Sequence, residues 1–116
     1  MQKINTSVVP LYNWGDNCAG WRLLQSPSLS VTQELMPPHT SEKWHYHQVS
    51  QQVFYVLSGK AIMYFDTEKF ELISGDAIHV PPGVIHCLKN ESNEALSFLV
   101  IANPQVNDDR FEVEHH

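Results

Sequence analysis

The side chains best suited to chemistry in this 116-residue chain are three histidines. His45 and His47 lie two positions apart, and His86 lies 39 positions after His47. In a β-strand, side chains at i and i+2 point to the same face, so the first pair can share one metal ion if a neighbouring strand supplies the third imidazole. Three neutral imidazoles suit zinc, iron, copper or nickel better than magnesium or calcium.

Gln52 is the fourth candidate ligand. It follows His47 by five positions and opens the apolar run of residues 53–57, which we expect to be a central strand. We expect this strand to pair antiparallel with the histidine strand, which would bring the Gln52 amide oxygen to the same ion. Such a ligand set leaves coordination positions open for water, oxygen or a substrate, as catalytic metal sites do.

The elements that must position these residues are predicted to be strands throughout. Short β-rich runs bounded by turn residues recur along the chain, and no stretch shows clean helical periodicity, which is typical of an all-β sandwich or barrel. Residues 53–57 and 61–65 flank Ser58-Gly59-Lys60, which predicts a tight hairpin. His86 need only lie on a strand alongside the histidine pair.

The length fits a single domain. We expect residues 1–20 to be an N-terminal segment that packs on the barrel or at a dimer edge, residues 21–103 to be the β-barrel, and residues 104–116 to be a polar C-terminal tail. His115 and His116 resemble the remnant of a purification tag, so they are left out of the site.

Composition excludes several classes of partner. The net charge is −6, with only seven lysine and arginine residues and no basic run, so neither nucleic acid nor a membrane surface is an expected partner. The longest apolar stretch, residues 95–102, is too short to span a bilayer, and the N-terminus lacks the pattern of a signal peptide. Cys18 and Cys87 form no C-x-x-C pair and are expected to be free thiols. We therefore expect a cytoplasmic protein.

Four charged residues are candidates for anion binding or for proton transfer. Arg22 and Arg110 are the only arginines, and although either can clamp a carboxylate or phosphate, surface ion pairs are expected for both. Glu34 and Glu42 are candidate general bases only if the fold brings them into the pocket.

Two segments resemble the motifs of the cupin family. Residues 45–59 resemble the first motif, H-x-H-x(3,4)-E-x(6)-G, with His45, His47, Gln52 and Gly59 at its fixed positions. Residues 75–90 resemble the second motif, G-x(5)-P-x-G-x(2)-H-x(3)-N, and match every fixed position: Gly75, Pro81, Gly83, His86 and Asn90. Fifteen residues separate Gly59 from Gly75, as in small microbial cupins.

The resemblance to small single-domain cupins implies an RmlC-like jelly-roll barrel, a double-stranded β-helix, with a metal inside. It implies that His45, His47 and His86 are the histidine ligands, that Gln52 stands in the place of a glutamate ligand, and that the protein is a homodimer. The implied cofactor is one divalent transition metal, namely Fe, Mn, Zn, Ni or Cu.

Gln52 is the departure from the family pattern. An uncharged amide would leave the inner sphere of a divalent ion at +2 rather than +1, which implies weaker metal retention and a stronger Lewis acid. Alternatively, Gln52 turns away and leaves a three-histidine site, or metal binding has been lost.

Two functions follow from the resemblance. The first is a metal-dependent dioxygenase, isomerase or lyase that acts on a small molecule, and the second is a non-enzymatic small-molecule or metal-binding sensor. A storage-protein-like structural role fits the short chain less well. Fold alone does not choose between the first two.

Overall fold

The computed structural model describes residues 1–115, and this range contains strands but no helix. His116, one of the two histidines set aside above, lies outside the described residues. In chain order the strands are β1 (Leu11–Trp14), β2 (Cys18–Gln25), β3 (Ser30–Met36), β4 (Thr40–Ser41), β5 (His45–Tyr46), β6 (Gln51–Ser58), β7 (Ala61–Phe65), β8 (Lys69–Leu72), β9 (Ala77–Val80), β10 (His86–Asn90), β11 (Leu96–Asn103) and β12 (Phe111–Glu112). The predicted all-β class is confirmed.

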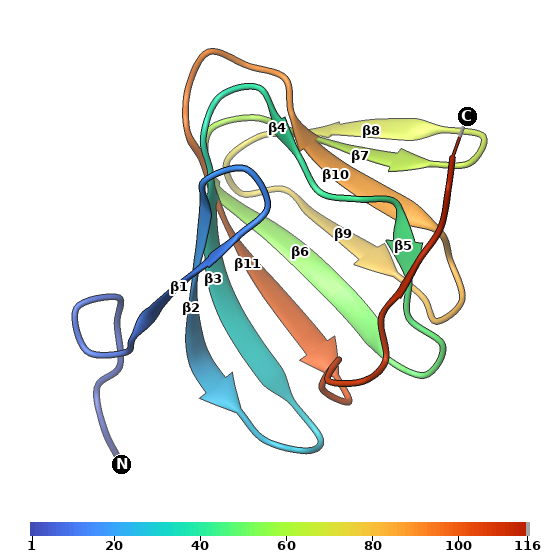
Figure 1. The fold of residues 1–116 in the computed structure, drawn as a ribbon. Coiled ribbons are helices and arrows are strands. Elements are labelled where there is room, and N and C mark those ends of the chain that lie inside the picture. The colour runs from blue at the N-terminus through green and yellow to red at the C-terminus, as the bar shows by residue number, and fades with distance from the viewer. Residues whose placement is uncertain (116) are drawn as a thin grey trace.

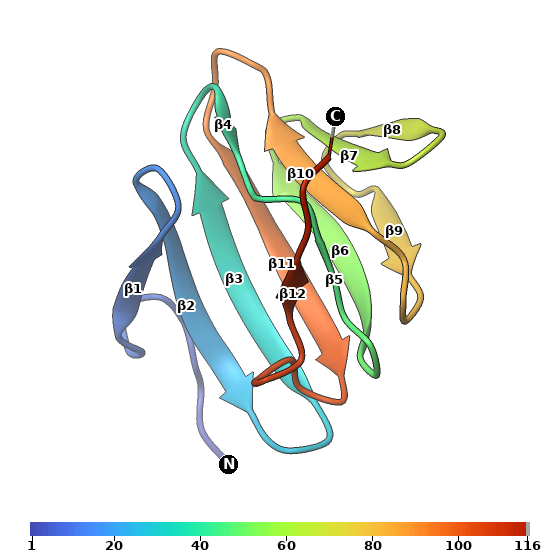
Figure 2. The same cartoon turned by 45° about the vertical axis from the view of Figure 1, so that its right-hand side comes forward.

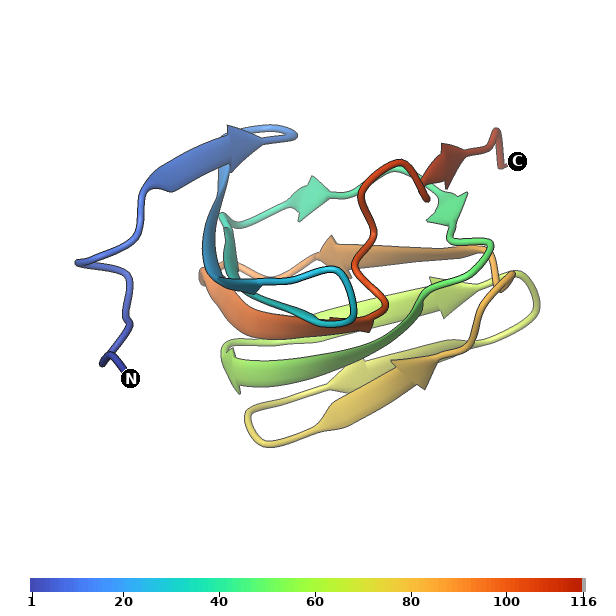
Figure 3. The same cartoon turned by 90° about the horizontal axis from the view of Figure 1, so that it is seen from below.

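These strands form two sheets that face each other, as Figures 1 and 3 show. The first sheet has the order β1-β2-β3-β11-β6-β9. The second has the order β12-β5-β10-β7-β8, with β4 pairing separately with β10. Neighbouring strands run antiparallel, so the molecule is the two-layered jelly roll that the sequence predicted.

The core lies between the sheets and follows from strand alternation. On β11, Leu96, Phe98, Val100 and Ala102 are buried, while the residues between them are only half-buried. The core residues from both sheets are Cys18, Met36, Phe54, Val56, Ala61, Met63, Leu72, Val80, Leu88, Leu96, Phe98 and Val100. Each fully buried aliphatic or aromatic side chain contributes roughly 1.5–3 kcal/mol relative to exposure, so this core accounts for a large favourable term.

The predicted hairpin between residues 53–57 and 61–65 is wrong. β6 is an internal strand, as expected, but it pairs with β11 and β9, whereas β7 pairs with β10 and β8 in the other sheet. Gly59 explains the difference. Its φ is +89°, and a Cβ at this position would lie 2.5 Å from the Ala95 carbonyl oxygen. The turn therefore packs directly on the loop before β11. From there the chain crosses to the second sheet instead of returning beside β6.

The predicted pairing of the histidine strand with the strand after Gln52 is also wrong. β5 pairs with β10 and β12 in the second sheet, and β6 lies in the first. The segment between them crosses from one sheet to the other. Gln52 nevertheless faces inward, because it shares the buried face of β6 with Phe54 and Val56. It therefore approaches the histidines across the interior rather than along a ladder.

The two ends of the described chain lie at different places on this body. β1 pairs with β2 at the edge of the first sheet, and the residues before β1 extend away from the strands (Figure 1). β12 pairs with β5, so the segment after β11 returns along the second sheet (Figure 2). The described residues include no helix with the length and hydropathy needed to cross a membrane.

Candidate metal centre

Three histidines converge inside the barrel. His45 and His86 are paired across β5 and β10, which places both imidazoles on the inner face, and His47 follows just after β5. One nitrogen from each of the three rings lies within 4.8 Å of the others. All three side chains are almost fully buried. Three buried imidazoles this close together could hold one metal ion.

Backbone carbonyls fix the orientation of each ring. The Nδ1 atoms of His45, His47 and His86 lie 2.7 Å from Lys43 O, 2.5 Å from Asp109 O and 2.9 Å from Val84 O, respectively. Because a carbonyl only accepts, each Nδ1 carries the hydrogen and donates it. The Nε2 atoms are then unprotonated lone-pair donors, and those of His47 and His86 have no hydrogen-bond partner. Metal-ligating histidines are held in this way.

Burial keeps the three rings neutral. It lowers the pKa of His45 far below its usual range, and the neighbouring His86 and Arg110 lower it further. Burial also lowers the pKa of His86 to about 4 and that of His47 in the same direction. Neutral imidazole is the ligating form, so no proton has to be displaced when a metal binds at neutral pH.

Gln52 points toward the same place. Its side chain is buried, and its Oε1 has no hydrogen-bond partner. The amide also lies close enough to the His47 ring to raise the pKa of that imidazole, against the larger lowering by burial. An unpaired buried carbonyl oxygen costs roughly 1–3 kcal/mol, so this oxygen and the two free Nε2 atoms fit a group that would accept their lone pairs.

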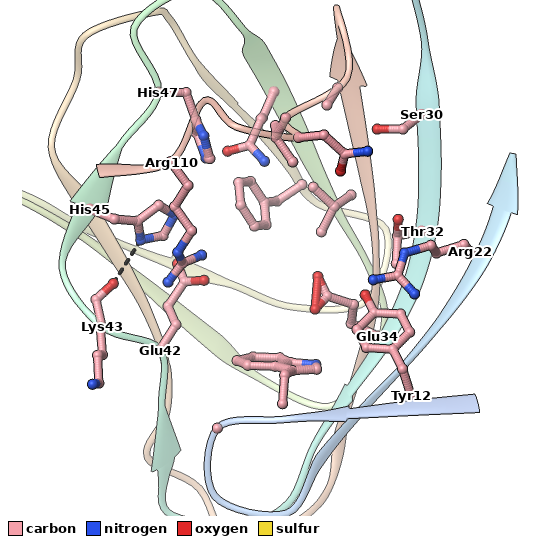
Figure 4. Close-up of a pocket in the computed structure, with 18 of the residues that line it drawn as sticks. Tyr12, Arg22, Ser30, Thr32, Glu34, Glu42, Lys43, His45, His47 and Arg110 are labelled. Atoms are coloured by element: carbon pink, nitrogen blue, oxygen red, sulfur yellow. Dashed lines mark hydrogen bonds between the residues drawn. The ribbon is translucent and has the colours of Figure 1, made fainter. Parts of the chain in front are cut away.

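A cavity of about 660 Å³ opens in front of this cluster. Figure 4 shows two facing sides. His45 and His47 lie on one side, and Tyr12, Arg22 and Glu34 of β1, β2 and β3 lie on the other. Phe54 and Val100 belong both to the cavity lining and to the core. The cavity thus places an apolar surface and a polar surface within reach of one small molecule.

Both candidate general bases lie in the cavity lining, which satisfies the condition set from the sequence. Burial, together with the nearby Glu42, raises the pKa of Glu34 to about 8, although Arg110 and Arg22 oppose the shift. Burial raises the pKa of Glu42 to about 7, although the Leu88 N–H, which donates to Glu42 Oε1 at 2.8 Å, opposes the shift. The cavity therefore holds two carboxyl groups poised to exchange protons near neutral pH.

The segment after β11 contributes more to the site than the sequence indicated. The Asp109 carboxylate accepts the backbone N–H groups of Gln48, Val49 and Ser50 at 2.8, 3.0 and 2.8 Å, and the Asp109 carbonyl accepts from His47. Arg110, the next residue, lines the cavity. No local sequence pattern in residues 104–114 predicts these contacts, because the residues that Asp109 contacts lie about 60 positions earlier in the chain.

The two arginines also differ from the expectation of surface ion pairs. Arg110 does lie 3.6 Å from Glu112, yet its side chain extends into the cavity beside His45 and Glu42 (Figure 4). Arg22 stacks over the Tyr12 ring at 3.9 Å and lines the opposite side. Within residues 1–115, Arg22 has no acidic partner in ion-pair range.

Comparison with known families gives a match to the cupin domain over residues 32–102. An uncharacterised protein of Methanocaldococcus jannaschii is 31% identical over 84 residues, which are 72% of this chain and 67% of that protein. An uncharacterised protein of Aquifex aeolicus is 37% identical over 83 residues, which are 72% of this chain and 66% of that protein. The matched part therefore spans about two thirds of each relative.

Two further comparisons concern proteins with named activities. Quercetin 2,3-dioxygenase of Bacillus subtilis is 35% identical over 49 residues, which are 42% of this chain but 14% of that enzyme. The structure of the polyketide cyclase RemF from Streptomyces resistomycificus superposes with a TM-score of 0.83 at 19% identity, covering 100% of this chain and 87% of that one. At this identity the likeness is one of fold.

Proposed function

This chain belongs to the cupin family, and from that premise we propose that it binds one divalent transition metal and acts on a small molecule in the adjoining cavity. His45, His47 and His86 would be the histidine ligands, and the Gln52 amide oxygen would be the fourth. The observation that carries this proposal is the set of three buried, neutral imidazoles whose Nδ1 atoms are occupied and whose ligating nitrogens lie within 4.8 Å of one another.

The donor set limits the choice of metal without naming it. Imidazole nitrogen and amide oxygen suit Fe, Mn, Zn, Ni or Cu. Because no carboxylate is among the four donors, the inner sphere would keep the full charge of the ion. We expect weaker retention than with a glutamate, and a stronger pull on the electrons of any bound oxygen atom.

An enzyme is the function that the cavity supports best, in the class of metal-dependent dioxygenases, isomerases or lyases. When bound, the metal would supply Lewis acidity or oxygen activation. The chain's own residues would do the rest: Phe54 and Val100 would exclude water from one side of the ligand, and Glu34 or Glu42 would take or give a proton at a carboxyl oxygen. The partial likeness to quercetin 2,3-dioxygenase supports the first of these classes.

A non-enzymatic binding or sensor module is the alternative. The same histidines and cavity would hold a small molecule or a metal without turnover. The weaker metal retention expected with Gln52 favours this alternative, since a sensor must release what it binds.

One experiment tests the proposal and separates the two functions. Purified protein without a tag is reconstituted with each of the five metals, bound metal is measured by elemental analysis, and oxygen uptake is followed with diols, thiols and β-diketones. Stoichiometric metal with turnover supports the enzyme, and stoichiometric metal without turnover supports the binder. Less than about a tenth of an equivalent of every metal contradicts both metal-dependent functions.

We also propose that the protein is a homodimer. The first sheet has exposed apolar side chains on β6 and β2, namely Tyr55, Leu57 and Leu24 at 39, 37 and 42% exposure. An uncharged face can pack on its own copy about a two-fold axis without opposing like charges. A monomer in light scattering at micromolar concentration would contradict this proposal.

A cytoplasmic location is the last part of the proposal. Cys18 and Cys87 are both free and buried, as is usual where thiols stay reduced. Fractionation of cells that express the protein would test it, and recovery outside the cytoplasm would contradict it.

A further inference from the structure

We propose that Arg110 forms an anion-binding subsite beside the three histidines, so that the ligand of this cavity carries a carboxylate or another oxyanion group. This inference rests on the proposed function, because it names the class of ligand for the same cavity. It concerns a residue outside the cupin match, which ends at residue 102.

The position of Arg110 is fixed by its neighbour. Asp109 accepts three consecutive backbone N–H groups of the loop after His47 through its carboxylate, and its carbonyl accepts from the His47 ring. Two residues further on, β12 pairs with β5, so the chain is held on both sides of Arg110. Residue 110 therefore cannot leave the cavity without breaking contacts to the histidine strand itself.

The guanidinium of Arg110 has N–H donors that are available to a ligand. Among residues 1–115 its one acidic partner within 4 Å is Glu112, at 3.6 Å, and both of these side chains are about half exposed. A surface pair of this kind is worth about 0–1 kcal/mol and leaves most of the five N–H donors unused. The positive charge is close to the histidines, since it lowers the pKa of all three imidazoles.

The charges around the cavity favour binding of a negatively charged ligand. The four candidate ligands are neutral, so a bound divalent ion would keep its charge, and Arg110 would add another. Neither Glu34 nor Glu42 lies within ion-pair range of Arg110, although both line the same cavity. Burial also favours their protonated forms near neutral pH, and a protonated carboxyl is a donor to an oxyanion. The lining also includes the cations Arg22 and Lys43 and the anions Asp16 and Glu112, which offset one another. With Arg110 and a bound divalent ion, the cavity would then be locally positive in a chain of net charge −6.

Carboxylate recognition by arginine has a clear physical basis. The planar guanidinium matches the two oxygens of a carboxylate, and such charge-assisted bonds are roughly twice as strong as neutral ones. A ligand with one carboxylate oxygen toward Arg110 and the other toward the neutral histidines, which would hold the divalent ion, would meet both positive charges at once. The apolar Phe54 and Val100 would then contact the remainder of the ligand.

The experiment uses the full chain loaded with cobalt, whose visible absorption reports on ligands near the metal. Acetate is titrated in, and acetamide serves as the uncharged analogue of the same shape. We expect saturable binding of acetate and little response to acetamide. Arg110→Gln should raise the half-saturating acetate concentration on the order of tenfold or more, and Arg110→Lys should do so less. Lys60→Gln, an exposed residue outside the cavity, removes the same charge and should leave the titration unchanged.

Two outcomes overturn the subsite. The first is equal acetate binding by the wild type and Arg110→Gln, and the second is no acetate binding by the wild type at all. The cobalt stoichiometry of Arg110→Gln separates this proposal from the metal site, because it should remain one per chain even if the anion subsite fails. If the wild type takes up no cobalt, the proposed function fails, and calorimetric titration of acetate into the metal-free protein still tests Arg110 by the same comparison of variants.

Discussion

The two sides of the cavity use buried ionisable groups in opposite ways. On the side of the second sheet lies the histidine wall, a name we give to His45 and His47, which line the cavity, and to His86, which lies beside them. Each of the three rings has one nitrogen held by a backbone carbonyl. On the side of the first sheet, which we call the facing wall (Tyr12, Arg22 and Glu34), the Glu34 carboxyl has no hydrogen bond among the described residues. The rings of the histidine wall are therefore held in one orientation by hydrogen bonds, whereas the Glu34 carboxyl of the facing wall is not.

The same physical cause acts on both walls with opposite sign. Burial disfavours the charged form of any group, so it lowers the pKa of the histidines and raises that of Glu34. Both kinds of residue are therefore neutral near pH 7, one as a lone-pair donor and the other as a proton donor. The comparison teaches that the histidine wall is oriented by the fold itself and could hold a metal ion, whereas burial and neighbouring charges set the protonation state of Glu34 on the facing wall.

Removal of a histidine should have the largest effect, because it takes a candidate metal ligand out of the histidine wall and leaves the facing wall unchanged. His47→Ala takes away one imidazole and its bond to Asp109, and we expect bound metal to fall below about a tenth of an equivalent while circular dichroism shows an intact barrel. His79→Ala, which changes an exposed histidine outside this cavity, is the control and should keep full metal. Unfolding of the His47 variant would mean instead that the wall is needed for the fold.

Metal addition should stabilise the histidine wall and, through it, the whole chain. At about 100 times its Kd, zinc should raise the free energy of unfolding by about 2.7 kcal/mol, because a ligand that binds only the folded state shifts the equilibrium by mass action. Thermal or urea unfolding with and without a chelator measures the difference. An increase of the same size in His47→Ala would place zinc somewhere else.

Loss of the Asp109 carboxylate, which holds the loop after His47, should lower metal affinity less than loss of a histidine ligand does. Asp109→Ala keeps the carbonyl that accepts from His47 but removes the acceptor of three backbone N–H groups in the loop after His47. The loop then holds that carbonyl and the His47 ring less firmly, and we expect metal affinity to fall roughly 10–100-fold. Competition with a chelating dye gives the affinity. Asp108→Asn is the matched control, since its φ of +61° is one that asparagine tolerates, and equal affinities in the two variants would refute the role of Asp109.

On the facing wall, ionisation of Glu34 should make the free energy of unfolding depend on pH. Glu34 has a folded-state pKa of about 8, above its usual 4.5, so its contribution to stability is fully present below pH 4.5 and is lost as the pH rises through 8. Glu34→Gln cannot ionise and should lose less stability over this range, by on the order of 1–2 kcal/mol after water has relaxed around the carboxylate.

Urea unfolding of the metal-free protein, from about pH 7 to pH 8.5, measures this difference in a range where the histidines are mostly neutral in both states. Glu42, Arg110, Arg22 and Tyr12 all act on Glu34 or lie beside it, and they remain in both proteins, so their contributions largely cancel in the comparison. Parallel pH curves would show that Glu34 is already ionised at neutral pH.

The sequence predicted the histidine wall better than the facing wall. His45, His47 and His86 are placed by local rules, because strand alternation and the Pro81-Pro82-Gly83 bend act over a few residues. Gln52 was predicted to lie near them, but by a strand pairing that does not occur, since the chain crosses between sheets after His47. Gln52 faces inward nonetheless, because alternation on β6 fixes this direction whichever strand lies alongside, and its role as a ligand stays a prediction.

The rest of the site depends on contacts that no local pattern encodes. Asp109 meets His47 across 62 positions, and Glu34 meets Glu42 only once β3 and the segment before β5 face each other. The hairpin after β6 was predicted from turn chemistry alone, and the packing of Gly59 on the Ala95 backbone decided otherwise. Long-range packing of this kind is selected by the whole core, not by any one turn.

The 62-position separation between His47 and the Asp109 carbonyl also has a consequence for how the protein is made. Synthesis proceeds from the N-terminus, so His45 and His47 leave the ribosome well before the residue that orients His47 exists. A nascent chain of this kind has the imidazoles but not their arrangement. We expect the growing chain to be a poor competitor for cellular metal, and acquisition of the ion to follow closure of the barrel rather than to guide it.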